Sequence, residues 1–104
     1  MSILSWLGFW NSNIKDALLR GAVIIDVRSP AEFDRGKIPD SINIPVDRIP
    51  INSKRIRDMN HPVIFCCNSG DRSRQAVQMM KERGMKEVYY AGDWERLLRI
   101  VNKL

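Results

Sequence analysis

The sequence predicts an α/β fold with a small central, mostly parallel sheet of four to five strands and helices on both faces. Short β-branched apolar runs alternate along the chain with segments whose apolar residues recur at helical spacing. Glycine, proline or a helix-capping residue stands at most of the boundaries. Such alternation is typical of parallel sheets covered on both faces, and 104 residues, 44% of them apolar, suffice for one domain.

The chain begins with an apolar segment, residues 1–12, which is set apart from the predicted domain at 13–104. Its first ten residues hold two of the three tryptophans and carry no charged side chain. They lack the basic start and cleavage site of a secretory signal and are too short to span a bilayer. We expect the segment to pack on the domain rather than to insert at a membrane interface, and we expect the protein to be cytoplasmic.

The first half of the domain contains two helices and two strands by these criteria. Residues 13–20 place apolar side chains on one helical face and end at Gly21. Residues 22–27, AVIIDV, predict a buried strand. The next four residues, SPAE at 29–32, have the pattern of a capping box that opens a brief helix. Residues 41–46, SINIPV, alternate like a strand that stops at Pro45.

The second half repeats the alternation. A weak helix is predicted within residues 50–59, and PVIFC at 62–66 predicts a second fully apolar strand. Residues 73–83 then carry an inward apolar stripe and end at a glycine, as a helix does. A third apolar strand at 88–90 and a last helix capped by Asp93 complete the pattern.

Charge and cysteine content narrow the possible functions. The net charge of +5 is scattered along the chain, which favours a solvated basic surface and no nucleic-acid partner. The two cysteines, Cys66 and Cys67, are neighbours, so they provide no disulfide framework, and reduced thiols are expected. His61 is the only histidine, and we predict no metal site.

The loop between the second apolar strand and the next helix is the strongest candidate site. Residues 67–72 follow the strand directly, at the edge of the sheet where ligands bind in such folds. A loop curled there directs backbone N–H groups inward, and the helix beginning near Ser73 adds positive partial charge. With Arg72 close by, this environment favours the reactive thiolate of Cys67, and Gly70 permits the tight turn.

These residues resemble a known family. The stretch CNSGDRS, residues 67–73, is similar to the C-x-x-G-x-R-S active-site loop of single-domain rhodaneses. Residues 23–46 are similar to that family's D-V-R, E-F and G-H-I-P-G-A-x-N-I-P segments, and VYYAGDWERL to its C-terminal strand, glycine turn and tryptophan. The resemblance covers the chain from about residue 13. Lys37 and Asp40 depart from it, since the family usually has histidine and glycine there.

The resemblance implies a rhodanese-like fold and transfer of sulfane sulfur. Cys67 would take sulfur from a small anionic donor such as thiosulfate, hold it as a persulfide and pass it to cyanide or to a thiol or protein acceptor, with no cofactor. The implied donor-binding residues are Asn68, Ser69, Gly70, Asp71, Arg72 and Ser73. Arg72 could equally form an ion pair with Asp26 or Glu32, and Ser73 could simply cap the helix. Asp71 would weaken the binding of a dianion.

Three alternatives start from the same residues. Counting from Cys66 gives C-x5-R, the spacing of cysteine phosphatases, although Gly70 and Ser73 match the rhodanese pattern only from Cys67. A second alternative is a non-catalytic rhodanese-like binding module. A third is a redox sensor in which Cys66 resolves an oxidised Cys67, which the opposed side-chain directions of an extended segment disfavour. We expect Cys66 to be a small buried apolar residue.

Overall fold

In the computed structural model, which describes residues 12–104, the strands pair in parallel in the order β2-β1-β3-β4. They are β1 (Val23–Asp26), β2 (Ile42–Asn43), β3 (Val63–Cys67) and β4 (Val88–Asp93). This confirms the predicted α/β class. The predicted packing of residues 1–12 lies outside the described residues except for Ser12, which is exposed and helical. No helix in the described range is long and apolar enough to cross a bilayer.

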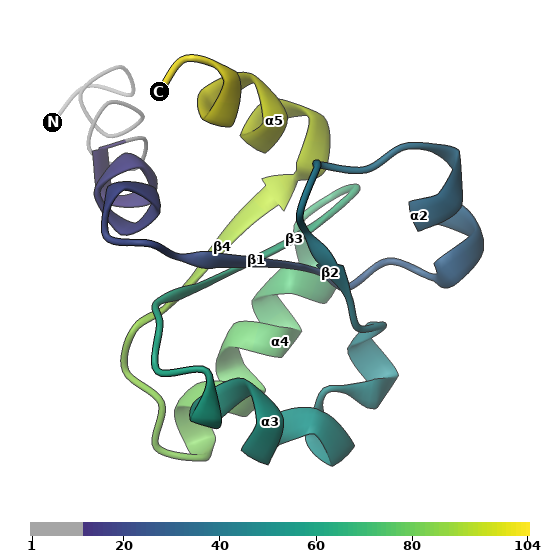
Figure 1. Cartoon of the computed structure of the whole chain (residues 1–104). Coiled ribbons are helices and arrows are strands. Elements are labelled where there is room, and N and C mark those ends of the chain that lie inside the picture. Colours follow the sequence, from purple (N-terminus) through teal and green to yellow (C-terminus); the bar gives the residue numbers. More distant parts are fainter. Residues whose placement is uncertain (1–11) are drawn as a thin grey trace, which may run out of the picture.

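Helices cover both faces of the sheet (Figure 1). On one face lie α3 (Ser53–Asp58) and α4 (Asp71–Glu82), and on the other lie the helix at residues 12–19 and α5 (Trp94–Asn102). The all-apolar strand β3 supplies both cores, because successive side chains of a strand point to opposite faces. Val63, Phe65 and Cys67 pack with α3 and α4, whereas Ile64 and Cys66 pack with α5 and the helix at 12–19.

The connection from β1 to β2 contains the predicted capping box. Helix α2 (Pro30–Arg35) begins after Ser29, whose hydroxyl oxygen accepts from the Glu32 N–H at 3.2 Å. The Glu32 carboxylate returns to accept from the Ser29 N–H at 2.9 Å. Two otherwise unpaired donors at the helix start are thereby satisfied, which fixes the Glu32 side chain at the carboxyl edge of the sheet.

The edge strands differ most from the prediction. Strand β2 is shorter than the strand predicted to run from residue 41 to Pro45, and Pro45 then leads into 3₁₀ turns at Val46–Arg48 and Pro50–Asn52 before α3. Strand β4 is longer than predicted, and its pairing with β3 shifts between Phe65 and Cys66. The shift is a bulge that carries the strand on to Asp93, which caps α5 by accepting from the Glu95 N–H at 3.0 Å.

Helix α4 begins two residues earlier than predicted, at Asp71 rather than at Ser73. Gly70 precedes it with φ of 101°, in the left-handed region that L side chains rarely adopt, and so turns the chain from strand to helix sharply. The loop is therefore only residues 68–70. Asp71 and Arg72, expected in the loop, lie in the first turn of α4, where a carboxylate such as Asp71 is favoured by the helix dipole.

Candidate active site

Cys67 lies at the carboxyl end of β3, beneath the turn into α4. The residue is fully buried, and the Gly70 N–H donates to its Sγ at 3.0 Å. The thiol donates to the Ser73 hydroxyl oxygen at 3.4 Å, and that hydroxyl donates in turn to the Gly70 carbonyl at 3.0 Å. The loop and the first turn of α4 thus close around one sulfur atom.

Cys66 is placed quite differently. Its side chain lies on the opposite face of the sheet, in the core with Ile64 and Leu97, and both cysteines are free thiols. Burial, followed by the nearby charge of Asp26, raises the pKa of the Cys66 thiol far above its ordinary value. Cys66 therefore stays protonated and apolar. The opposed faces of the two thiols are those expected from an extended strand.

The first turn of α4 begins beside the same sulfur, which contacts the Gly70 N–H and the Ser73 hydroxyl. The N–H groups of Asp71, Arg72 and Ser73 are the first of the helix and have no carbonyl partner within it. Together with the Gly70 N–H they form a set of donors at the positive end of a twelve-residue helix. Such a set suits an anion or the negative sulfur of a thiolate.

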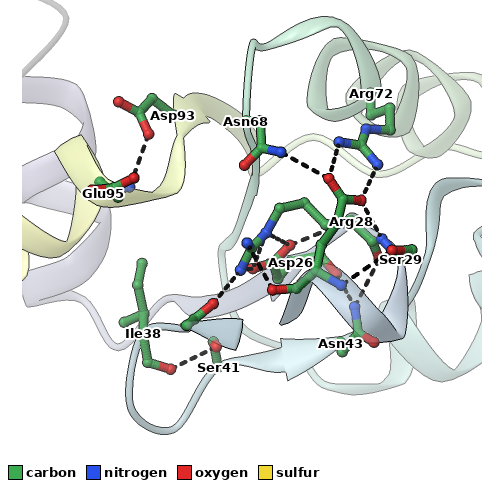
Figure 2. A network of polar contacts seen from close by, with 12 residues as sticks. Asp26, Arg28, Ser29, Ile38, Ser41, Asn43, Asn68, Arg72, Asp93 and Glu95 are labelled. Atoms are coloured by element: carbon green, nitrogen blue, oxygen red, sulfur yellow. Dashed lines mark hydrogen bonds and ion pairs between the residues drawn. The ribbon is translucent and has the colours of Figure 1, made fainter. Parts of the chain in front are cut away.

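Glu32 joins two of the predicted site residues. Its carboxylate accepts from both terminal nitrogens of Arg72, at 2.7 and 3.1 Å, and from the Asn68 amide at 2.8 Å. Figure 2 shows the side chains of Asn68 and Arg72 pointing toward this one carboxylate. The ion pair to Arg72, and then the bond from the Ser29 N–H, lower the pKa of Glu32 to about 2. Of the two acidic residues that could pair with Arg72, Glu32 is the one bound to it in the structure.

Asp26 pairs with Arg28 instead. The two side chains are almost fully buried, and the guanidinium donates to the carboxylate at distances down to 2.7 Å (Figure 2). Arg28 also donates to the carbonyls of Glu32 and Gly36, at 3.2 and 2.6 Å, and lies over the Trp94 ring at 4.6 Å. Burial alone would lower the pKa of Arg28, but the bonds to Asp26 raise it. This pair ties α2 and its following loop to the strand ends.

The remaining predicted residues have modest contacts. The Asp71 carboxylate oxygen Oδ1 lies 3.9 Å from Nη1 of Arg74, and both side chains are largely exposed. Arg74 also lies over the ring of Tyr90 at 5.6 Å. Ser69 is exposed in the loop.

Within residues 12–104, no group of three histidine, cysteine or acidic side chains could hold a metal ion.

One contributor was not identified from the sequence. Gly92, in β4, has φ of 69°, and a Cβ built on it would lie 3.7 Å from the Gly70 Cα. The turn at Gly70 therefore packs directly on the backbone of β4. The glycine in VYYAGDW was a visible signal, because glycine inside a strand often marks a bulge or a close backbone approach.

Comparison with known proteins identifies relatives of the chain. A family model described as rhodanese-like domain matches residues 11–98. A sulfurtransferase of Allochromatium vinosum is 36% identical over 66 residues, which span 64% of this chain and 61% of that protein. An E. coli rhodanese with anions has a TM-score of 0.65 and 30% identity, covering 72% of this chain and 89% of the other.

A further structural neighbour bears on the phosphatase alternative. It is a Rhodopseudomonas palustris protein of unknown function, described as a possible tyrosine phosphatase, with a TM-score of 0.70. The match covers 88% of this chain and 78% of the neighbour, at 24% identity. At that identity the likeness extends to the fold alone.

Proposed function

The chain belongs to the rhodanese-like domain family, and on that premise we propose that it is a sulfurtransferase that carries sulfane sulfur as a persulfide on Cys67. The observation that carries the proposal is the position of the Cys67 sulfur, which receives the Gly70 N–H and lies at the start of α4. Donors aimed at a sulfur in this way stabilise a thiolate, which is the nucleophilic form of cysteine.

In the first half-reaction the Cys67 thiolate attacks the outer sulfur of a small anionic donor such as thiosulfate. A new S–S bond forms, the bond between the two donor sulfurs breaks, and sulfite leaves with its electron pair. The backbone N–H groups of Gly70 and the first α4 turn hold the negative charge of the donor and of the departing group. Because Cys67 is fully buried, a small donor is favoured.

In the second half-reaction a thiophile attacks the terminal sulfur of the persulfide and Cys67 leaves as a thiolate. The terminal sulfur lies about 2 Å farther out than Sγ, the length of one S–S bond, so the persulfide presents an atom that the buried thiol does not. Cyanide serves in an assay, and we propose a thiol or a protein thiol as the acceptor in the cytoplasm.

The phosphatase alternative receives no support from the geometry. Its C-x5-R frame requires the Cys66 sulfur to enter the loop, but that side chain lies on the far face of the sheet in an apolar core. The redox-sensor alternative meets the same obstacle, since the two sulfurs face opposite sides of β3.

The proposal is tested by steady-state kinetics with thiosulfate and cyanide. We expect thiocyanate to form, with parallel lines in double-reciprocal plots, because the donor product leaves before the acceptor reacts. The same preparation is assayed with p-nitrophenyl phosphate. Phosphate release without thiocyanate would establish the phosphatase instead, and no turnover with any sulfur donor would establish a binding module.

Replacing Gly70 with alanine is expected to lower the rate of sulfur transfer and to destabilise the protein by about 1–2 kcal/mol, the cost of a left-handed L residue. Gly84 provides a matched control, because its φ of 88° is similar and a Cβ there meets nothing within 4 Å. Gly84→Ala should cost similar stability, measured by thermal unfolding, and leave transfer unchanged. Equal rates of sulfur transfer in both variants would show that Gly70 plays no part in the site.

A further inference from the structure

Arg72, the cationic residue closest to Cys67 in the sequence, already has an anionic partner. Arg72 is bound through both terminal nitrogens by the Glu32 carboxylate, and the same carboxylate holds the amide of Asn68, the residue next to Cys67. The capping bonds with Ser29 keep Glu32 in place. The Glu32 carboxylate therefore already binds the Arg72 guanidinium, which an incoming donor anion would otherwise bind.

The charge of Glu32 persists under ordinary conditions. Its side chain is about one quarter exposed, at 27%, and its pKa is about 2, so the carboxylate is ionised at neutral pH. The other arginine on this turn, Arg74, has a carboxylate close by in Asp71, at 3.9 Å. What the site offers a donor is thus mainly the uncharged backbone N–H groups around Cys67. A second negative charge on the donor would meet the Glu32 carboxylate, and Arg72, the cation in contact with that carboxylate, is already paired with it.

We propose that Glu32 sets the charge preference of this site, so that sulfane-sulfur donors with a single negative charge are used in preference to dianionic thiosulfate. The inference rests on the proposed sulfurtransferase activity and narrows its substrate class. Glu32 acts through Arg72 and Asn68, and it is a specificity-determining residue rather than a catalytic one.

Two small donors that differ in charge test the proposal through the change in their ratio between variants. Methanethiosulfonate has a methyl group where thiosulfate has a charged oxygen, so the two are similar in size and differ by one charge. In each case the Cys67 thiolate bonds to the outer sulfur and the donor S–S bond breaks. Methanesulfinate leaves from the first and sulfite from the second, each with the bonding pair, and cyanide then accepts the sulfur from both.

The measurement is kcat/KM for each donor in the wild type and in Glu32→Gln. Glutamine retains the oxygen that the capping box requires and removes the charge. We expect the wild type to favour methanethiosulfonate, and the variant to shift the ratio toward thiosulfate by about tenfold, a typical effect of one nearby unit charge between water and a protein surface. The change should lie mainly in KM for thiosulfate.

Glu87→Gln is the matched control. Glu87 also pairs with an arginine, Arg20 at 3.1 Å, but it precedes β4, at the opposite end of the strands from Cys67. The same substitution there should leave the donor ratio unchanged. An equal shift in both variants would assign the effect to net charge and overturn the proposal.

Arg72→Gln provides a second variant of opposite sign. It leaves Glu32 charged but without its counter-charge, so the preference for the monoanion should increase. Equal use of both donors by the wild type, or an unchanged ratio in both Glu32→Gln and Arg72→Gln, would overturn the assignment to Glu32 while leaving sulfur transfer intact. Failure of both donors to form thiocyanate in every variant would overturn the proposed function itself.

Discussion

Cys67→Ala is expected to abolish thiocyanate formation, with a loss of about a thousandfold or more, because Cys67 is the proposed persulfide carrier and the other thiol, Cys66, lies on the opposite face of β3. The Cys67 sulfur is the atom toward which the Gly70 N–H and the Ser73 hydroxyl converge. Removing it deletes the proposed nucleophile and leaves the hydrogen-bonding groups around it in place. The measurement is the rate of cyanide-dependent thiocyanate production at saturating donor.

Cys66→Ala is the control for this experiment. It removes the sulfur of the preceding residue, equally buried but on the other face of β3. Because burial raises the pKa of the Cys66 thiol, that group supplies no thiolate at neutral pH. Cys66→Ala should retain the rate of the wild type within a few-fold, and loss of activity in this variant with retention in Cys67→Ala would contradict the assignment.

Asp26→Asn is expected to cost about 3–5 kcal/mol of unfolding free energy, because it leaves the buried Arg28 guanidinium without its counter-charge. Arg28 is only 3% exposed, so water cannot replace the lost carboxylate. The corresponding fall in the melting temperature is on the order of 10–20 °C for a domain of this size. Thermal and urea unfolding followed by circular dichroism measure the change.

An exposed ion pair provides the comparison for Asp26. Asp16 binds Arg20 at 2.9 Å, with 66% of the Asp16 side chain and 42% of the Arg20 side chain exposed. Solvent screens that pair, so Asp16→Asn should not change stability measurably. If both variants unfolded at the temperature of the wild type, the buried pair would not hold α2 to the sheet.

Much of this fold could be predicted because local and tertiary preferences agree. The run from Val63 to Cys67 is entirely apolar, as a strand buried on both faces must be, and all five residues are buried. Ser29 and Glu32 have the spacing of a capping box, and both of its hydrogen bonds are present. Such features depend on a few neighbouring residues, which the sequence displays directly.

The predictions were wrong or incomplete where packing between residues distant in the sequence determines the structure. The start of α4 depends on the left-handed turn at Gly70, which packs against Gly92 of another strand. The partners of the arginines are likewise a tertiary matter. Asp26 and Glu32 were both possible partners of Arg72, and only the approach of α2 to the loop places Glu32 there and gives Asp26 to Arg28.

The most direct test of persulfide formation on Cys67 is the mass of the intact protein after incubation with thiosulfate or methanethiosulfonate and removal of excess donor. We predict the addition of one sulfur atom, mapped by peptide analysis to Cys67, lost on treatment with cyanide and retained in Cys66→Ala. A protein that gains no sulfur from either donor, or that carries the added sulfur on Cys66, would contradict the account.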